Sequence, residues 1–246
     1  MTQQKFESGF TLIEMAMVLM IVSLLLGSLM VPFAARLEQG KIADTQQTEI
    51  TIIEALMGYM IVNGRLPCPA SASSYGVESF AGGGNESNGL CSNFYNGWVP
   101  AVTLGLSNID NQGYAVDAWN TRIHYAVTSA NNNAYTKSNG ITLASSADLS
   151  VCSTASANSS SCSVTNSILS ANTPAVVYSL GKNAATGGSS ADEAENPNLN
   201  SIDNDKVFVS HTPTINGASG GEFDDLVTWI SPNILFGRLV AAGKLP

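Results

Sequence analysis

Gly9-Phe10-Thr11-Leu12-Ile13-Glu14 begins a long apolar run, and this stretch decides the architecture of the chain. The run from Phe10 to Ala35 has 26 residues, of which only Glu14 is charged. A helix of that length extends roughly 39 Å, more than the bilayer hydrocarbon core of about 30 Å. The sequence therefore predicts a transmembrane helix over residues 10–35. A single carboxylate near the start of such a helix is costly in lipid, so Glu14 should have a partner.

The same residues resemble a known targeting signal. Residues 1–9 form a polar leader that ends in Gly9, and Phe10-Thr11-Leu12-Ile13-Glu14-Met15 then opens the apolar helix. This arrangement is similar to the prepilin signal of type IV pilins and type II secretion pseudopilins. The resemblance implies that a prepilin peptidase cuts between Gly9 and Phe10 and that the new amino group of Phe10 is methylated. It also implies that Glu14 pairs with the Phe10 amine of a neighbouring subunit in a filament.

An ordinary signal anchor or secretory signal peptide fits these residues less well. Lys5 is the only basic residue of the leader. The apolar run exceeds the about 7–15 residues of a secretory signal, and no Ala-x-Ala cleavage site follows it.

Composition narrows the class of function. The chain has 246 residues and a net charge of −9, with charged residues at only 12%. Its ten basic residues form no patch, so we expect no nucleic-acid partner. The acidic surplus indicates a solvated exterior with affinity for cations.

Four cysteines are expected to form two disulfides outside the cytoplasm. Three connectivities are open, and we favour the pairs nearest in sequence, Cys68–Cys91 and Cys152–Cys162, because each brackets a Gly- or Ser-rich loop. Each bridge should stabilise the fold by roughly 3 kcal/mol. A metal site at these cysteines is not indicated, because no Cys-x-x-Cys occurs.

The helix should continue beyond the apolar run. Residues 36–63 are amphipathic, with apolar side chains at three- and four-residue steps that include Ile50, Leu56 and Met60. Asn63-Gly64 should end the helix, and Pro67 prevents its resumption.

Residues 64–246 should form a β-rich extracytoplasmic head. Residues 70–97 are predicted to be a tethered loop. Predicted strands cover Arg122–Thr128, Ile141–Ala144, Leu149–Cys152, Pro174–Leu180, Val207–His211 and Leu226–Ile230. Ser231 should cap a final helix with Pro232 at its first position. The resemblance implies a pilin-like α+β fold, in which a long N-terminal α-helix packs its second half on an antiparallel β-sheet head.

An acidic loop over residues 181–206 is a candidate calcium site. It is crowded with oxygen ligands suited to Ca²⁺ and follows Ser179-Leu180-Gly181, which resembles the segment before the calcium loop of major pseudopilins. The first ligands expected are Asp192, Glu195 and Asp203. The alternative is a solvated acidic loop, and the spacing matches no EF-hand.

The sequence contains one partial enzyme signature and one histidine in a strand pattern, and neither forms a catalytic set. Gly217-Ala218-Ser219-Gly220-Gly221 fits Gly-x-Ser-x-Gly, but no histidine follows it in the chain, as a hydrolase would need. His124 has no nucleophile that the sequence places beside it. The chain is therefore expected not to be an enzyme.

Two functions remain from different classes. One is a structural subunit, a minor pilin or pseudopilin of a type IV pilus or type II secretion filament. The other is an adhesin or substrate-binding module displayed on a filament. Either would be inserted in the inner membrane as a single-pass protein with its head in the periplasm, and then assembled with other subunits by an inner-membrane platform.

Overall fold

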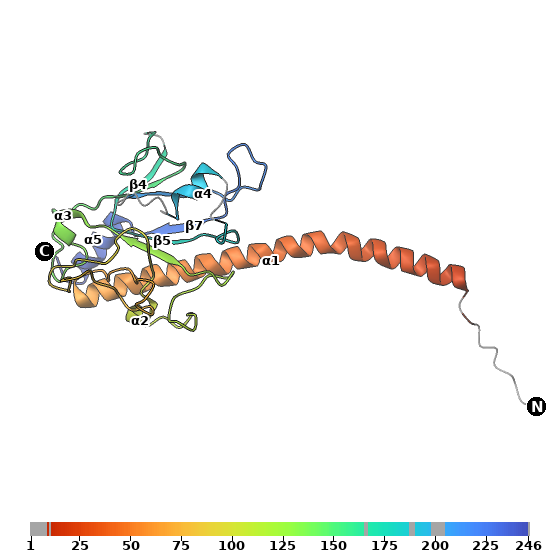
Figure 1. The fold of residues 1–246 in the computed structure, drawn as a ribbon, viewed down its shortest axis with the longest axis horizontal. Helices are drawn as coiled ribbons and strands as arrows, with labels where there is room; N and C mark the ends of the chain where they lie inside the picture. Colours follow the sequence, from red (N-terminus) through yellow and green to blue (C-terminus); the bar gives the residue numbers. More distant parts are fainter. Residues whose placement is uncertain (1–8, 10, 165–166, 187–189, 198–204, 246) are drawn as a thin grey trace, which may run out of the picture. The chain divides into compact units, whose positions relative to one another are not determined.

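The computed structural model describes residues 9, 11–164, 167–186, 190–197 and 205–245, without the side chains of residues 28–32 (Figure 1). The chain divides into two compact units, residues 1–43 and residues 44–246. Helix α1 (Leu12–Asn63) begins in the first unit and ends in the second.

Within the first unit, α1 is continuous, and almost all of its described side chains are exposed. Among the described residues, none of the helices combines the length and the apolar character that a membrane crossing requires. This finding does not confirm the predicted transmembrane segment over residues 10–35, part of which lies outside the described residues.

The head, in the second unit, contains two sheets. The first has strand order β1-β2-β5-β7 and is antiparallel throughout; its members are β1 (Gly97–Trp98), β2 (His124–Val127), β5 (Ala175–Ser179) and β7 (Leu226–Trp229). The second has order β4-β3-β6 and joins β3 (Leu149–Cys152) antiparallel to β4 (Ile168–Thr173) and parallel to β6 (Val207–Val209). The head is therefore α+β, with an antiparallel sheet as its centre.

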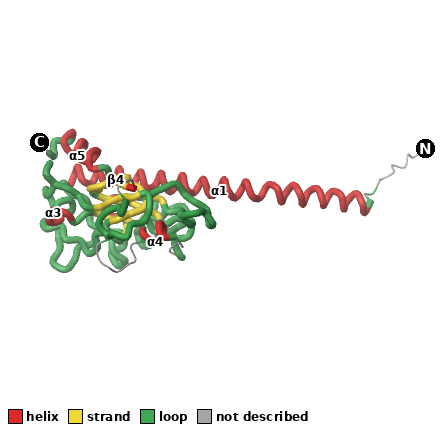
Figure 2. Tube along the Cα trace, turned by 90° about the horizontal axis from the view of Figure 1, so that it is seen from above, coloured by secondary structure: helices red, strands yellow, loops and turns green. Residues whose placement is uncertain are grey.

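Residues of the first sheet alternate between two apolar layers. On one face, Tyr125 and Val177 pack with Leu56 and Met60 of α1 and with Leu235 of α5 (Pro232–Ala241). On the other face lies a second cluster, in which Ala126, Val176 and Tyr178 pack against Leu149, Val151 and Phe208 of the second sheet. Figure 2 shows the strands gathered beside the C-terminal part of α1. Each buried Leu or Met in such a layer stabilises the head by about 1.5–3 kcal/mol.

The buried stripe of α1 includes Leu56 and Met60, as expected, but not Ile50. Thr45, Glu49, Ile52, Leu56 and Met60 are buried at steps of three or four residues. The prediction for Ile50 is wrong, because its side chain is 50% exposed. The neighbouring residue Glu49 faces the core instead. Apolar periodicity alone would place a carboxylate at this position in solvent.

The helix ends as predicted. Gly64 has a φ of +68° and its N–H donates to Met60 O at 2.8 Å, which closes the last turn. A Cβ at this glycine would lie 2.9 Å from Asn139 Oδ1, so the turn favours glycine.

Most predicted strands are present; β3 has the predicted bounds, and β2, β5, β6 and β7 are shorter than predicted. Residues 141–144 form no strand, so that prediction is wrong. Strand β4 was not predicted, because Ile-Leu-Ser-Ala-Asn-Thr over 168–173 is a polar, mostly exposed edge strand.

Ser231 precedes α5 and Pro232 is at its start, but Ser231 makes no side-chain cap hydrogen bond, contrary to expectation. Short helical segments at α2 (Ala101–Leu104), α3 (Ala130–Asn133) and α4 (Ala191–Glu195) complete the described elements.

Candidate functional site

The predicted cleavage region is described at Gly9 and from Thr11 onward, while Phe10 lies outside the described residues. Helix α1 begins at Leu12, so Thr11 is at the N-cap position and Glu14 is in the first turn. The backbone N–H of Glu14 donates to Thr11 Oγ1 at 3.3 Å. Thr-x-x-Glu is the capping-box pattern, and a carboxylate in the first turn is stabilised by the helix dipole. The residues of the signal therefore also start the helix.

The structure joins the cysteines in the pairs favoured from sequence. Cys68 is bonded to Cys91 and Cys152 to Cys162, with Cα–Cα distances of 5.3 and 5.7 Å. The first bridge ties the loop that follows α1, and the second ties a polar loop that follows β3.

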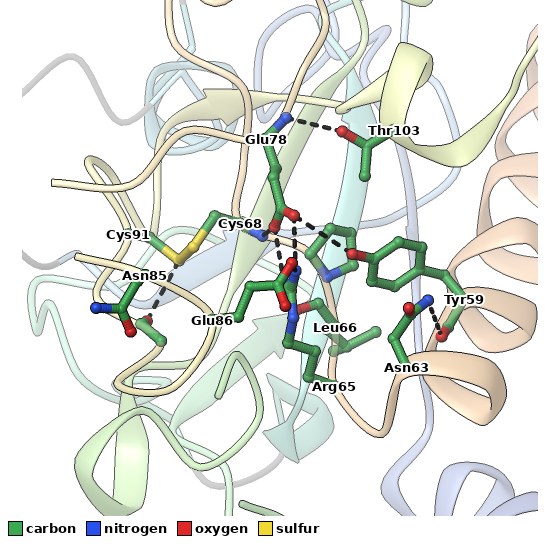
Figure 3. A network of polar contacts seen from close by, with 12 residues as sticks. Tyr59, Asn63, Arg65, Leu66, Cys68, Glu78, Asn85, Glu86, Cys91 and Thr103 are labelled. Carbon is green, nitrogen blue, oxygen red and sulfur yellow. Dashed lines mark hydrogen bonds and ion pairs between the residues drawn. A yellow bond between two sulfur atoms is a disulfide. The ribbon is translucent and has the colours of Figure 1, made fainter. Parts of the chain in front are cut away.

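A buried arginine organises the first of these loops (Figure 3). The Arg65 guanidinium donates to both carboxylate oxygens of Glu78, from Nη1 to Oε2 and from Nη2 to Oε1, each at 2.7 Å. Its Nη2 also reaches Glu86 Oε1 at 3.0 Å. The Cys68 N–H donates to Glu78 Oε2 at 3.1 Å, which connects this network to the first disulfide. Glu78 and Glu86 both belong to the loop, so Arg65 holds the loop against the end of α1.

The electrostatics of this network follow from burial and pairing. Burial opposes the charge of Arg65, but the hydrogen bonds and charge of Glu78 outweigh it and raise the pKa of the guanidinium. Burial, together with the nearby Glu78 carboxylate, raises the pKa of Tyr59 to about 12. Arg65 is thus fully engaged in ion pairs with Glu78 and Glu86, which indicates a structural role.

Of the three predicted calcium ligands, the structure describes Asp192 and Glu195. Asp192, in α4, accepts from Thr154 Oγ1 at 3.0 Å, and its other oxygen lies 3.3 Å from His211 Nε2. Burial raises the pKa of Glu195 to about 7, with a further contribution from Asp205. Asp203 lies outside the described residues.

A different acidic group joins that loop to the residues just before β7. Ligand atoms of Glu193, Asp224 and Asp225 lie within 4.8 Å of one another. Burial, reinforced by neighbouring carboxylates, raises the pKa of Asp224 to about 7 and that of Asp225 to about 8. Sequence reasoning missed this group because Asp224 and Asp225 are about thirty residues from Glu193 in the chain. Calcium binding by the 181–206 loop stays a prediction.

Among the described residues, neither His124 nor Ser219 is part of a catalytic nucleophile–base pair. His124 is half-buried at the start of β2 and stacks on Tyr178 with ring centroids 4.9 Å apart. Burial lowers the pKa of His124 to about 4. Ser219 lies in a hairpin tip between Thr214 and Phe223, which pair with each other, and no helix follows it as in a hydrolase elbow.

Comparison with known protein families decides the meaning of the N-terminal segment. The prokaryotic N-terminal methylation motif matches residues 4–30. The chain carries the type IV pilin and pseudopilin signal. This motif supports a pilin-like or pseudopilin subunit, and it implies processing by prepilin peptidase and assembly with other pilin subunits. No curated protein and no solved structure matches the chain.

Proposed function

We propose that this protein is a minor pilin or pseudopilin, a structural subunit of a type IV pilus or a type II secretion filament. The observation that carries the proposal is the methylation motif at residues 4–30, which runs directly into α1. In this proposal the peptidase cuts between Gly9 and Phe10, and Phe10 becomes the methylated N-terminus.

The proposed route starts in the inner membrane. Residues 10–35 hold the precursor as a single-pass protein with its head in the periplasm, and an assembly platform then moves the mature chain into a filament. Glu14 pairs with the methylated amine of a neighbouring Phe10, so that neither charge is left alone in an apolar filament core.

Buried contacts and a network of polar bonds connect the head firmly to the assembly helix. Leu56 and Met60 of α1 are fully buried in the main core cluster. The Arg65 network and the Cys68–Cys91 bridge fasten the chain that follows the helix. A pull on α1 would therefore be transmitted to the core of the head.

The test of assembly is a carboxylate substitution in the native host. Glu14→Gln should still be processed, because the cleavage point is unchanged, but it should be lost from the filament fraction. Glu38→Gln, on the same helix, is the matched control and should assemble as the parent does. Normal incorporation of Glu14→Gln would contradict the proposed pairing.

A binding role for the head is the second candidate, and the loop tied by Cys152–Cys162 is the observation that favours it. Its side chains are polar and mostly exposed, and Ser156 bonds Ser161 O and Ser163 Oγ at 2.7 Å. Replacing residues 153–161 by a Gly/Ser linker of equal length should leave filaments intact. Loss of surface attachment or of substrate capture in that variant would favour the binding role, and loss of filaments would favour the structural role.

A further inference from the structure

A polar cavity of about 260 Å³ lies in the head between α1 and the start of β7. Three parts of the chain line it: α1, the segment after β6, and the residues around the start of β7. Its polar lining includes Gln46, Glu49, Ser210, His211, Asp225 and Thr228. No lysine or arginine is among the described residues that line it.

Glu49, one of the residues that line this cavity, has a buried carboxylate oxygen without a hydrogen-bond partner among the described residues. The side chain is fully buried, and Oε2 accepts a hydrogen bond from Thr228 Oγ1 at 2.7 Å. Among the described residues, Oε1 has no hydrogen-bond partner. A backbone hydrogen bond from Ser179 to this carboxylate lowers the pKa of Glu49, while Oε1 itself has no partner among the described residues. A buried carboxylate oxygen without a donor is costly, so this atom is suited to a ligand.

The other charged groups around the cavity do not neutralise Glu49. Asp225 also lines the cavity, with one oxygen bonded to Asn196 Nδ2 at 2.8 Å. Asp117 adds negative charge near Glu49, and Glu193 and Asp224 add it near Asp225. The one basic ring at the cavity, that of His211, is engaged with Asp192 and with Thr212 O.

We propose that this cavity binds a divalent cation of the calcium class, held by Glu49 and Asp225 and by retained water. Once both are ionised, the two carboxylates balance a double positive charge, and hard cations prefer oxygen ligands. Ca²⁺ takes about 6–8 oxygen ligands, and a water molecule occupies about 30 Å³, so the cavity has room for an ion with part of its hydration shell.

This site differs from the loop site expected from sequence. Glu49 belongs to the assembly helix, far along the chain from residues 181–206, and it was not among the predicted ligands. A cation at Glu49 and Asp225 would tie α1 to the start of β7. Bound cation would thereby stabilise the attachment of the head to the helix, and this consequence does not depend on the kind of filament.

The test uses the full chain in detergent micelles, freed of metal with a chelator and then titrated with CaCl₂. The wild type should bind Ca²⁺ in a calorimetric titration, with a Kd of about 10⁻⁴–10⁻³ M as in other extracytoplasmic modules, and its unfolding temperature should rise. Glu49→Gln and Asp225→Asn should each weaken binding by about tenfold or more. Glu54→Gln, on the same helix but exposed, should bind as the wild type does.

Folding of each variant is checked by circular dichroism in the presence of chelator. Glu49→Gln keeps the size of the side chain, and Asp225→Asn provides a second, independent variant. Absence of Ca²⁺ binding by the wild type at millimolar concentration would overturn the proposal. So would binding that survives Glu49→Gln and is abolished by Glu193→Gln, because the ion would then lie in the acidic group beside the loop.

Discussion

Glu49→Gln should make the stability of the head less sensitive to pH. Burial raises the pKa of Glu49 to about 8 from an ordinary value of 4.5, against the opposing effect of the Thr228 hydrogen bond. The folded state therefore holds a proton on Glu49 at pH values where the unfolded chain has released it. This contribution to stability is fully present below about pH 4.5 and is lost as pH rises through about 8.

The size of the effect follows from the difference between the two pKa values. At about 1.4 kcal/mol for each pH unit between them, the loss is at most about 5 kcal/mol over that window. Asp224 and Asp225 also have raised pKa values and contribute in the same direction, so the wild type alone does not isolate Glu49. The contribution of Glu49 is isolated by comparing the pH dependence of stability of the wild type with that of Glu49→Gln.

The assay is urea unfolding of the full chain in detergent, with chelator present, at a series of pH values from about 4 to about 9. Wild-type stability should fall faster with rising pH than that of Glu49→Gln. Glu54→Gln is the control on the same helix, because Glu54 is exposed and its bond to Arg238 lowers its pKa. Parallel pH profiles for the wild type and Glu49→Gln would refute the reasoning.

Two further substitutions test the packing of the head, each by urea unfolding. Arg65→Leu leaves Glu78 buried without its partner and should destabilise by about 3–5 kcal/mol, whereas Arg238→Leu, at an exposed ion pair, should change stability by less than about 1 kcal/mol. Equal effects of the two would contradict the assigned role of Arg65. Leu56→Ala should cost about 2–5 kcal/mol and Ile50→Ala much less, because only the first side chain is buried; the reverse order would mean that the wrong face of α1 packs on the sheet.

The parts of the fold that were predictable are those set by local pattern. Gly64 after Asn63 marks the end of α1 because a left-handed residue closes a helix turn. The apolar segments that became β5 and β7 could be recognised as strands from their composition alone. Pairing of the cysteines nearest in sequence was also predictable, since each pair encloses a polar loop.

The parts that were missed depend on contacts between distant residues. Glu49 reads as a solvent-facing carboxylate, but its hydrogen-bond partner Thr228 is 179 residues away. Strand β4 has no apolar alternation because it lies at an exposed sheet edge. Arg65 likewise meets Glu78 and Glu86 only after the loop has folded back. No local pattern contains these partners, so burial of their charges could not be predicted.

The most direct test of the central claim is intact mass spectrometry of the protein from filaments sheared off the native host. The account predicts a chain that begins at Phe10, carries one added methyl group, and has its four cysteines oxidised in two pairs. The same processed chain found only in the cell envelope would assign it to a secretion pseudopilus. A chain that still carries residues 1–9 would contradict the claim that this protein is processed and assembled as a pilin-type subunit.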